Sequence, residues 1–424
     1  MGAIVLKNIS VSGQQKDILI DKGLIKKIEP ASYSTGWNIA GDVEIMDCTG
    51  KVAVPGFVNM HAHSSMSLMR GVGEDMLFHE WLSKIWQMEA NLDEEFIYWG
   101  TKVACLEMIK TGTTTFNDQY WFQNQSAKAA AEAGLKAGIC YIICDRMDPS
   151  SFSRIKDECL QSYEESLSWP QEAQFLVCCH AIYSVSDEML KWGIDFARKH
   201  NLRMHIHLSE TEKEVKDCME QHGGLSPVEY LEEMGFLGPD VIAAHTLWLS
   251  DKDVEILGKH NVTCVHNINS NLKLASGYRF RYKELKEAGA NVCLGTDGCA
   301  SSNNLDILEA MKTSAIVQKA WRQDPSTLPL DELFACATVN GAKALGLNTG
   351  TIEEGRFADI SIVDTDNSFF LSPAPFLGNL VYSAHSDCID SVISNGRFVM
   401  RHREINDEKE ILKEARKVIS QIKY

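Results

Sequence analysis

Eight short apolar runs, each ended by a polar residue, recur along the middle of this 424-residue sequence. They read VPGFVNMHAH, TTTFND, KAGICYIIC with Asp145 after it, FLVCCH, RMHIHLSE, VIAAH, VTCVHN and NVCLGTD. Stretches of helical character, such as DEEFIYWGTKVACLEMIKTG, separate most of them. Apolar strands that alternate with helices are typical of a parallel sheet covered on both faces. Eight such units between Phe57 and roughly residue 345 predict an α/β protein with a (β/α)₈ TIM barrel, a fold that typically takes about 250 residues.

The two ends of the chain have a different pattern. Residues 1–55 hold short alternating runs broken by polar turns, and the same pattern returns after Gly350. The pair Asn395-Gly396 is a hairpin turn signal. We therefore expect residues 1–55 and 349–424 to form a small composite β-sandwich from the N- and C-terminal segments, with residues 56–348 as the barrel.

Charge and hydropathy exclude several kinds of partner. The chain has 41 Lys and Arg against 58 Asp and Glu, a formal net charge of −17. Such a surface repels polyanions, so we expect no nucleic-acid partner and no membrane partner. No apolar run is long enough to span a bilayer, and the first residues become acidic too early for a signal peptide. A cytoplasmic location is the expectation.

Histidines gather at the ends of the predicted strands. In a barrel of this kind the active site lies at the C-terminal ends of the strands. Six of the 13 histidines of the chain lie at such ends. The residues at these ends are His61, His63, Asp118, His180, His207, His245, His266 and Asp297. Because residues i and i+2 share one face of a strand, His61 and His63 can converge on a single point.

A metal ion is the candidate for that point. His61 and His63 end the first run, His207 ends the fifth and Asp297 ends the eighth. Three neutral imidazoles and a carboxylate suit one divalent ion such as Zn²⁺, with a position left for water; Fe²⁺ and Mn²⁺ stay open. A lone histidine is more often an ordinary hydrogen-bonded residue, but four residues at matching strand ends favour a metal site.

Three residues are candidates for proton transfer. Glu210 follows His207 by three residues, where a carboxyl group could carry a proton between water and a leaving group. In isolation, a glutamate in SETEKE is more often part of a solvated helix surface. His245 either orients the water or contacts one of the metal-binding residues without binding the metal itself. Asp297 could accept a proton from the water as well as bind the metal.

Motifs of other chemistries are absent from the sequence. His79-Glu80 begins an H-E-x-x-H pattern, but Ser83 occupies the second histidine position. No G-x-S-x-G elbow, G-x-G-x-x-G turn or P-loop occurs. A non-catalytic barrel that stores metal or binds a partner stays open as a hypothesis from another class, although storage requires no positioned acid such as Glu210.

Six segments together resemble the amidohydrolase superfamily. They are PGFVNMHAH, HIHLSE, AAHTLWLS, VHNINSNLKLASG, GTDGCASSNNLDILEAMK and GTIEEGRFADISIVD. Within that superfamily they are most similar to the 5-methylthioadenosine/S-adenosylhomocysteine deaminases, on the branch shared with the triazine hydrolases. The resemblance covers almost the whole chain. It implies the same barrel with a β-sandwich from both chain ends, and one metal ion, usually zinc, on His61, His63, His207 and Asp297.

The resemblance also implies roles for residues of the pocket. Glu210 would be the proton shuttle and His245 a partner of the attacking water. Glu89 would hold the ribose hydroxyls, and His180 would lie beside the sugar. Members that take S-adenosylhomocysteine bind its carboxylate through arginine, and Arg146 and Arg154 are the candidates here.

The resulting hypothesis is a metal-dependent hydrolytic deaminase of adenosine-type nucleosides. Its substrate would be a small purine nucleoside, 5′-methylthioadenosine, S-adenosylhomocysteine or adenosine, converted to the inosyl product and ammonia. The alternative is an aminohydrolase or chlorohydrolase of the same superfamily that acts on guanine, a pyrimidine or a triazine. A base without ribose has no diol for Glu89 to hold. The sequence decides neither whether the protein forms a homo-oligomer nor which 5′ substituent it prefers.

Overall fold

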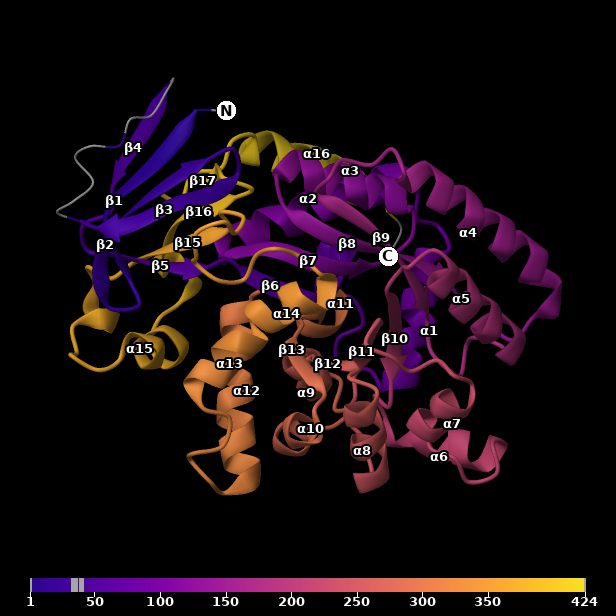
Figure 1. Cartoon of the computed structure of the whole chain (residues 1–424). Helices are drawn as coiled ribbons and strands as arrows, with labels where there is room; N and C mark the ends of the chain where they lie inside the picture. The colour runs from indigo at the N-terminus through magenta and orange to yellow at the C-terminus, as the bar shows by residue number, and fades with distance from the viewer. Residues whose placement is uncertain (1, 32–36, 38–41, 423–424) are drawn as a thin grey trace.

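A curled parallel sheet of nine strands forms the centre of the computed structural model, which describes residues 2–31, 37 and 42–422 (Figure 1). All eight predicted runs are strands of this sheet. The strands are β6 (Phe57–His63), β7 (Thr113–Gln119), β8 (Lys136–Ile143), β9 (Ala173–Cys179), β10 (Met204–Leu208), β11 (Val241–His245), β12 (Thr263–His266), β13 (Asn291–Leu294) and β14 (Asp297–Gly298).

The curl brings the first and last runs together. The strand order is β13-β12-β11-β10-β9-β8-β7-β6-β14, and the paired strands run parallel. Only Gly295 and Thr296 separate β13 from β14 in the chain. Gly295 N–H donates to His266 O at 3.1 Å, and Thr296 N–H donates to His61 O at 3.1 Å. The eighth run therefore joins β12 on one side and β6 on the other.

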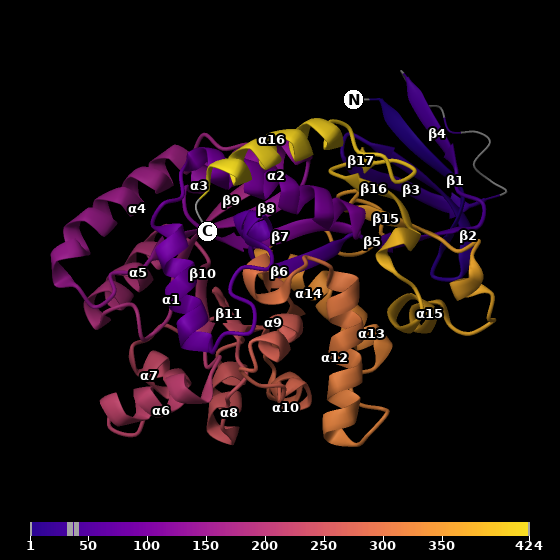
Figure 2. The ribbon, with the colours of Figure 1, turned by 180° about the vertical axis from the view of Figure 1, so that it is seen from behind.

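Helices follow most of the strands and cover the outer face of the sheet, as the two opposite views show (Figures 1 and 2). They are η2 (Ser64–Met69), α1 (Phe78–Glu89), α2 (Glu94–Lys110), α3 (Gln123–Ala133), η3 (Pro149–Ser151), α4 (Phe152–Ser166), α5 (Asp187–Lys199), α6 (Glu212–Gln221), α7 (Pro227–Glu233), α8 (Asp251–Lys259), α9 (Ile268–Lys273), α10 (Tyr282–Ala288), α11 (Cys299–Ser302), α12 (Ile307–Arg322), α13 (Leu330–Cys336) and α14 (Val339–Leu345).

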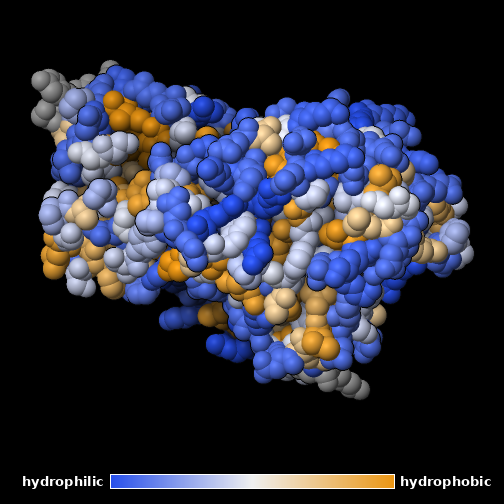
Figure 3. Space-filling model, turned by 90° about the horizontal axis from the view of Figure 1, so that it is seen from below, coloured by the Kyte–Doolittle hydropathy of each residue, from blue (hydrophilic) through white to orange (hydrophobic). Residues whose placement is uncertain are grey.

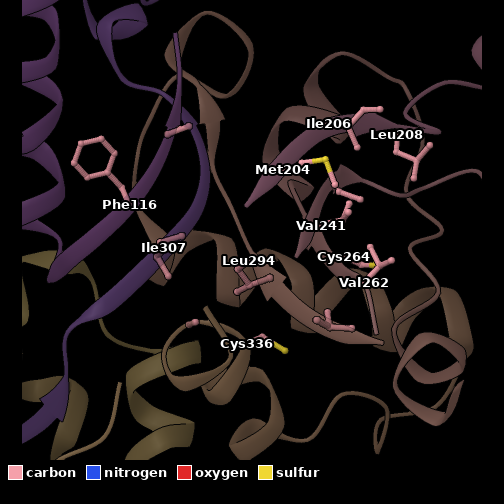
Figure 4. Close-up of a cluster of buried hydrophobic side chains, with 14 of the residues drawn as sticks. Phe116, Met204, Ile206, Leu208, Val241, Val262, Cys264, Leu294, Ile307 and Cys336 are labelled. Atoms are coloured by element: carbon pink, nitrogen blue, oxygen red, sulfur yellow. The ribbon is translucent and has the colours of Figure 1, made fainter. Parts of the chain in front are cut away.

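The alternation of side chains along each strand divides the core into two layers. Met204, Ile206 and Leu208 of β10 belong to the large core between sheet and helices (Figure 4). A smaller cluster lies inside the curl and contains Ile242, Val265 and other residues that alternate along the strands with those of the large core. Because successive side chains of a strand point to opposite faces, the residues that alternate with the outer core point into the curl.

Both ends of the chain contribute to a second sheet. Its strands are β1 (Ala3–Val11), β2 (Gln14–Asp21), β3 (Leu24–Pro30), β4 (Val43–Asp47), β5 (Lys51–Pro55), β15 (Ile360–Asp364), β16 (Ile389–Ser394) and β17 (Arg397–Met400). The order is β17-β16-β15-β5-β1-β2-β3, with β4 on β1. Most pairs are antiparallel as expected, but β4 and β5 run parallel to β1. The remaining C-terminal elements are η4 (Ser368–Phe370), α15 (Phe376–Tyr382), η5 (Ser386–Cys388) and α16 (Glu408–Gln421).

The predicted hairpin turn at Asn395-Gly396 is confirmed. It joins the antiparallel strands β16 and β17. Asn395 and Gly396 have φ angles of 51° and 73°, and two central residues with positive φ are what a two-residue type I′ turn requires.

A buried ion pair connects the two sheets. Lys136, the first residue of β8, places Nζ 2.7 Å from both carboxylate oxygens of Asp359, which precedes β15. Both side chains are buried. The same carboxylate accepts a hydrogen bond from Asn395 N–H at 2.8 Å.

Among the residues that the model describes, no helix combines the length and the apolar character needed to cross a membrane. The face seen from below is predominantly hydrophilic, with hydrophobic residues distributed between the polar ones (Figure 3).

Candidate active site

His61 and His63 point into the curl because β6 contains a bulge. The register between β6 and β7 shifts between Asn59 and Ala62, so that β6 has one residue more than its neighbour. A bulge of this kind reorients the side chains that follow it. Nε2 of His61 lies 3.3 Å, and Nε2 of His63 3.1 Å, from the same oxygen, Oδ1 of Asp297.

Oδ1 of Asp297 faces the imidazoles because the other carboxylate oxygen, Oδ2, is hydrogen-bonded to two serine hydroxyl groups. Oδ2 accepts hydrogen bonds from Ser270 Oγ at 2.6 Å and Ser301 Oγ at 2.9 Å. The backbone of Asp297 has a φ of 64°, a left-handed conformation that non-glycine residues adopt rarely and that is concentrated at functional sites.

His207 and His245 complete the cluster from β10 and β11. The His207 ring centroid lies 5.0 Å from that of His61 and 5.5 Å from that of His245. Two sets of side chains have nitrogen or oxygen atoms within 4.8 Å of one another: His61, His207 and His245, and His61, His63 and Asp297. Both sets include His61, so five side chains from four strand ends lie around this residue.

The donor atoms of the cluster fit a metal ion. Nδ1 of His63 contacts Gln119 O at 2.6 Å, and Nδ1 of His207 contacts His180 O at 2.9 Å. Because a carbonyl only accepts, both rings hold a proton on Nδ1, which leaves Nε2 as the atom that can bind a metal. Nε2 of His61 is buried and has no hydrogen-bond partner within the described part of the chain. Imidazole nitrogens with one carboxylate are the ligand set that Zn²⁺ prefers.

The charges of the cluster are set by burial and by Asp297. Burial lowers the pKa of His61, and it lowers that of His207 well below its usual value. Burial also opposes the charge on His63, but its contact with Asp297 outweighs burial and raises the pKa of His63 to about 9. The pKa of Asp297 is held well below its ordinary value, against the effect of burial, by the neighbouring imidazoles of His61 and His63.

Glu210 lies beside the cluster, shortly after the end of β10. Burial raises its pKa well above the ordinary value, and the charges of Asp297 and Glu214 act in the same direction. Its Oε1 lies 3.7 Å from Nδ1 of His245. The backbone N–H groups of Ser209 and Glu210 donate to the two carboxylate oxygens of Glu214, each at 2.8 Å. Glu210 is thus a buried acid whose surroundings favour the protonated form and whose backbone is held by Glu214.

A pocket of about 710 Å³, including its open mouth, lies over the cluster. Its lining includes His63, His207, Glu210, His245 and Asp297. It also includes one stripe of helix α1, at the spacing of a single helical face: Phe78, Trp81, Leu82, Ile85, Trp86 and Glu89. A largely apolar wall with a few polar groups is typical of a small-molecule site.

Three of the residues predicted to bind substrate line this pocket. Burial raises the pKa of Glu89, although hydrogen bonds from Tyr120 and Trp121 oppose the change. His180 contacts Ser184 Oγ through Nδ1 at 2.7 Å, and burial lowers its pKa to about 3. The Arg146 guanidinium lies 4.9 Å from the centroid of the Trp86 ring on α1.

Arg154 lies elsewhere. Its side chain is 62% exposed on α4, pairs with Glu158 at 2.9 Å and does not line the pocket. Two further strand-end residues also point away from the pocket. His266 stacks on Phe280 with centroids 4.2 Å apart, and Asp118 accepts hydrogen bonds from Ser64 N–H and Oγ.

Three residues that support the site were not predicted from the sequence. They are His205 and Asn117 beside the cluster, and Glu214, which holds the backbone of Glu210. Nε2 of His205 lies 3.0 Å from Nδ1 of His61, and Nδ1 of His205 lies 2.9 Å from Nδ2 of Asn117. The sequence did contain a signal for His205, because HIH in the fifth run repeats the H-x-H spacing of the first run. Glu214, which holds the backbone of Glu210, had no such signal among the acidic residues of SETEKE.

Fold and site together define a class of protein, an α/β protein that gathers imidazole and carboxylate groups at the ends of parallel strands. Residues 52–399 match the model of the Amidohydrolase family. The chain belongs to this family.

Similar proteins span nearly the whole chain. A Methanoregula boonei protein named 5′-deoxyadenosine deaminase is 43% identical over 417 residues, 97% of this chain and 93% of that protein. An Archaeoglobus fulgidus protein named 5-methylthioadenosine/S-adenosylhomocysteine deaminase 1 is 42% identical over 402 residues, 93% of this chain and 94% of that protein. The structure of an adenosine deaminase from Xanthomonas campestris with bound zinc matches with a TM-score of 0.91 and 28% identity, covering 99% of this chain and 98% of that one.

Proposed function

We propose that this protein is a metal-dependent hydrolytic deaminase of adenosine-type nucleosides, with one divalent ion, zinc in the first place, held by His61, His63, His207 and Asp297. The observation that carries the proposal is that two sets of side chains share His61, one with His207 and His245 and one with His63 and Asp297, and that the buried acid Glu210 lines the same pocket. The names of the similar proteins support the deaminase activity. When bound, such an ion would supply the acidity that makes water a nucleophile near neutral pH.

The protein's own groups account for the proton transfers. Water adds to the amino-bearing ring carbon, and Asp297 accepts a proton from it. Glu210 gives its proton to the neighbouring ring nitrogen, then takes the second proton of the water from the new hydroxyl group and passes it to the amino group, which leaves as ammonia. The proton held by Asp297 then passes to Glu210, which restores both groups. The product carries a carbonyl group where the substrate carried the amine. His245, 3.7 Å from Glu210, orients the water.

The substrate class follows from three other residues that line the pocket, Glu89, His180 and Arg146. A carboxylate accepts two hydrogen bonds from a cis-diol, so Glu89 holds the ribose hydroxyls. His180 lies beside the sugar. Of the two arginines considered, Arg146 is the candidate to bind a charged 5′ substituent, because it lines the pocket and Arg154 does not.

We extend the proposal to the architecture. Residues 56–348 form the catalytic (β/α)₈ barrel, with β13 and β14 as parts of its eighth strand. Residues 1–55 and 349–424 form a composite β-sandwich folded about β1, which pairs with β2, β4 and β5.

An ammonia-release screen tests the activity. Protein with its metal content measured is offered adenosine, 5′-deoxyadenosine, 5′-methylthioadenosine, S-adenosylhomocysteine, free purine and pyrimidine bases and triazines. We expect release from the nucleosides and little from the bases. Release confined to guanine, a pyrimidine or a triazine would contradict the proposed substrate class, and a metal-loaded protein inert toward every compound would favour a non-catalytic barrel.

The Glu89→Ala variant tests the nucleoside assignment separately. Loss of the diol contact is expected to lower kcat/KM for adenosine substrates by about 10–100-fold, the cost of unpairing charged hydrogen bonds of about 1.5–3 kcal/mol. Glu95→Ala, at an exposed position in the first turn of α2, is the matched control and should match the parent. An unchanged kcat/KM in Glu89→Ala would remove the main support for a ribose-binding site.

A further inference from the structure

The floor of the pocket is a layer of side chains from the ends of successive strands. Cys140 belongs to the cluster inside the curl, and its Sγ lies 3.7 Å from Oδ1 of Asn117, so both side chains point inward. Because residues i and i+2 share one face of a strand, Gln119 and Ile142 point inward one step closer to the pocket. The members of this layer that line the pocket, from β6 to β10, are His63, Gln119, Ile142, His180 and His207.

Gln119 is the polar residue of this layer to which the proposed function gives no role. It is 1% exposed, and within the described part of the chain its Oε1 has no hydrogen-bond partner. Buried side-chain amides are normally hydrogen-bonded. The two ends of an amide are nearly equal in shape, so this side chain can offer the pocket either an oxygen acceptor or an N–H donor. A buried amide without a protein partner in the lining of a small-molecule pocket indicates a contact with the ligand.

The neighbours of Gln119 define the part of the ligand that it faces. Its backbone oxygen lies 2.6 Å from Nδ1 of His63, so the residue lies beside the proposed metal site. Tyr120 and Trp121, the next two residues, hydrogen-bond to Glu89, the residue proposed to hold the ribose hydroxyls. Gln119 therefore lies between the place of the amino-bearing carbon and the place of the sugar.

The proposed position of Glu210 then selects one edge of the base. Glu210 follows β10, which β8 and β9 separate from β7, and in the proposed reaction it contacts N1, the ring nitrogen beside the amino-bearing carbon. In a purine, N1 and N7 flank that carbon on opposite sides, and the five-membered ring that contains N7 also carries the ribose. N7 can only accept a hydrogen bond, and the amide Nε2 can donate one.

We infer that Gln119 is a substrate-binding residue whose Nε2–H donates a hydrogen bond to N7 of the base, so that the pocket selects purines over bases with carbon at that position. The inference rests on the proposed function, because it uses the proposed places of the amino-bearing carbon, N1 and the ribose. It adds a contact on the edge of the base that Glu210 does not reach.

A pair of nucleosides that differ only at position 7 tests this contact. Inosine and 7-deazainosine have no amino group to release, so isothermal titration of each into metal-loaded protein measures binding alone. We expect the parent to bind inosine about tenfold more tightly, the effect of one hydrogen bond in a buried site. In Gln119→Met a side chain of similar length cannot donate, so the two affinities should agree within about twofold. Gln161→Met, the same substitution at an exposed position of α4, is the matched control and should keep the preference.

The result in the parent requires no variant, so it decides the matter even if Gln119→Met does not fold. Equal affinities of the parent for the two nucleosides would overturn the inference, and so would a preference that persists in folded Gln119→Met. Ammonia release from adenosine is measured separately. Release without a preference for inosine would overturn this inference alone, whereas a preference without release from any nucleoside would overturn the proposed activity alone.

Discussion

Glu210 is the residue whose chemical state depends most on its surroundings. Burial, the Asp297 charge and the Glu214 charge all raise its pKa. These surroundings favour the protonated form, which is the form that can donate to a ring nitrogen. An environment that keeps one carboxyl group neutral beside another that stays ionised is a recurring way to assign acid and base roles.

The Glu210→Gln variant tests this role. The amide keeps the shape of the side chain but cannot carry a proton, so kcat should fall by about 10²–10⁴-fold. Because Glu210 is not among the proposed ligands, the variant should hold as much metal as the parent. The measurement is kcat together with metal content of the same preparation, and a kcat within about threefold of the parent would contradict the shuttle role.

Among the elements, the first turn of α6 supports the site directly. Thr211 caps this helix, and its Oγ1 accepts from Glu214 N–H at 3.1 Å. Glu214 in turn accepts from the backbone of Ser209 and Glu210. Ser209 has a φ of 52°, so the chain turns sharply between β10 and the acid, and the helix terminus holds that turn in place.

Removing this support should misplace Glu210 without removing it. We expect Glu214→Ala to lower kcat by about 10–100-fold, since a displacement of about 1 Å can have that effect, with metal content unchanged. Glu212→Ala, whose side chain is 54% exposed and pairs with Lys216 on the same helix, is the matched control. Equal kcat values for the two variants would show that Glu214 does not position the acid.

The β16–β17 hairpin gives a stability prediction with a defined pH dependence. Asp390 is half-buried; despite burial, its pKa is lowered by Ser391, Lys51 and His402. A carboxyl group with a depressed folded-state pKa stabilises the fold above its unfolded pKa, and the effect is lost as the pH falls through the folded value. Asp390→Asn should cost about 1–2 kcal/mol at pH 7 and progressively less as the pH falls below the ordinary aspartate pKa of about 3.9, measured by urea unfolding. A cost independent of pH would contradict this origin.

Strand alternation decided which residues could be placed from the sequence. It correctly puts His61 with His63, and it would also have put His205 with His207, because both pairs are i and i+2. The same rule places His266 outside the curl, next to the inward Val265 of the inner cluster. His245 follows no such rule: its φ of 72° redirects it, and a left-handed backbone at a non-glycine residue has no reliable sequence signal.

Pairing between distant segments was harder to predict. The strands of the central sheet were predictable because they lie in eight largely apolar runs, although the division of the eighth run into β13 and β14 was not. The parallel pairing of β4 and β5 with β1 was not, because register between short, half-buried strands depends on contacts far apart in the chain. Arg154 illustrates the same limit, since its position in the sequence did not determine the direction of its side chain.

At the scale of the whole molecule, the Lys136–Asp359 pair holds the terminal sheet against the central one. Breaking a buried ion pair leaves an uncompensated charge. Lys136→Met should therefore reduce the free energy of unfolding by about 3–5 kcal/mol, measured by urea denaturation. The double variant Lys136→Met/Asp359→Leu should lose less than the single one, because no charge is left unpaired. Lys283→Met, 67% exposed, is the control, and a single variant no less stable than this control would contradict the prediction.

The proposed function requires that side chains from separate strand ends share one ion. A crystal structure of the zinc-loaded protein, with anomalous diffraction recorded across the zinc edge, measures this directly. We predict one anomalous peak per chain, about 2.0–2.2 Å from Nε2 of His61, His63 and His207 and from a carboxylate oxygen of Asp297. A peak bound by other residues, or no peak in protein that had been offered zinc, would contradict the account.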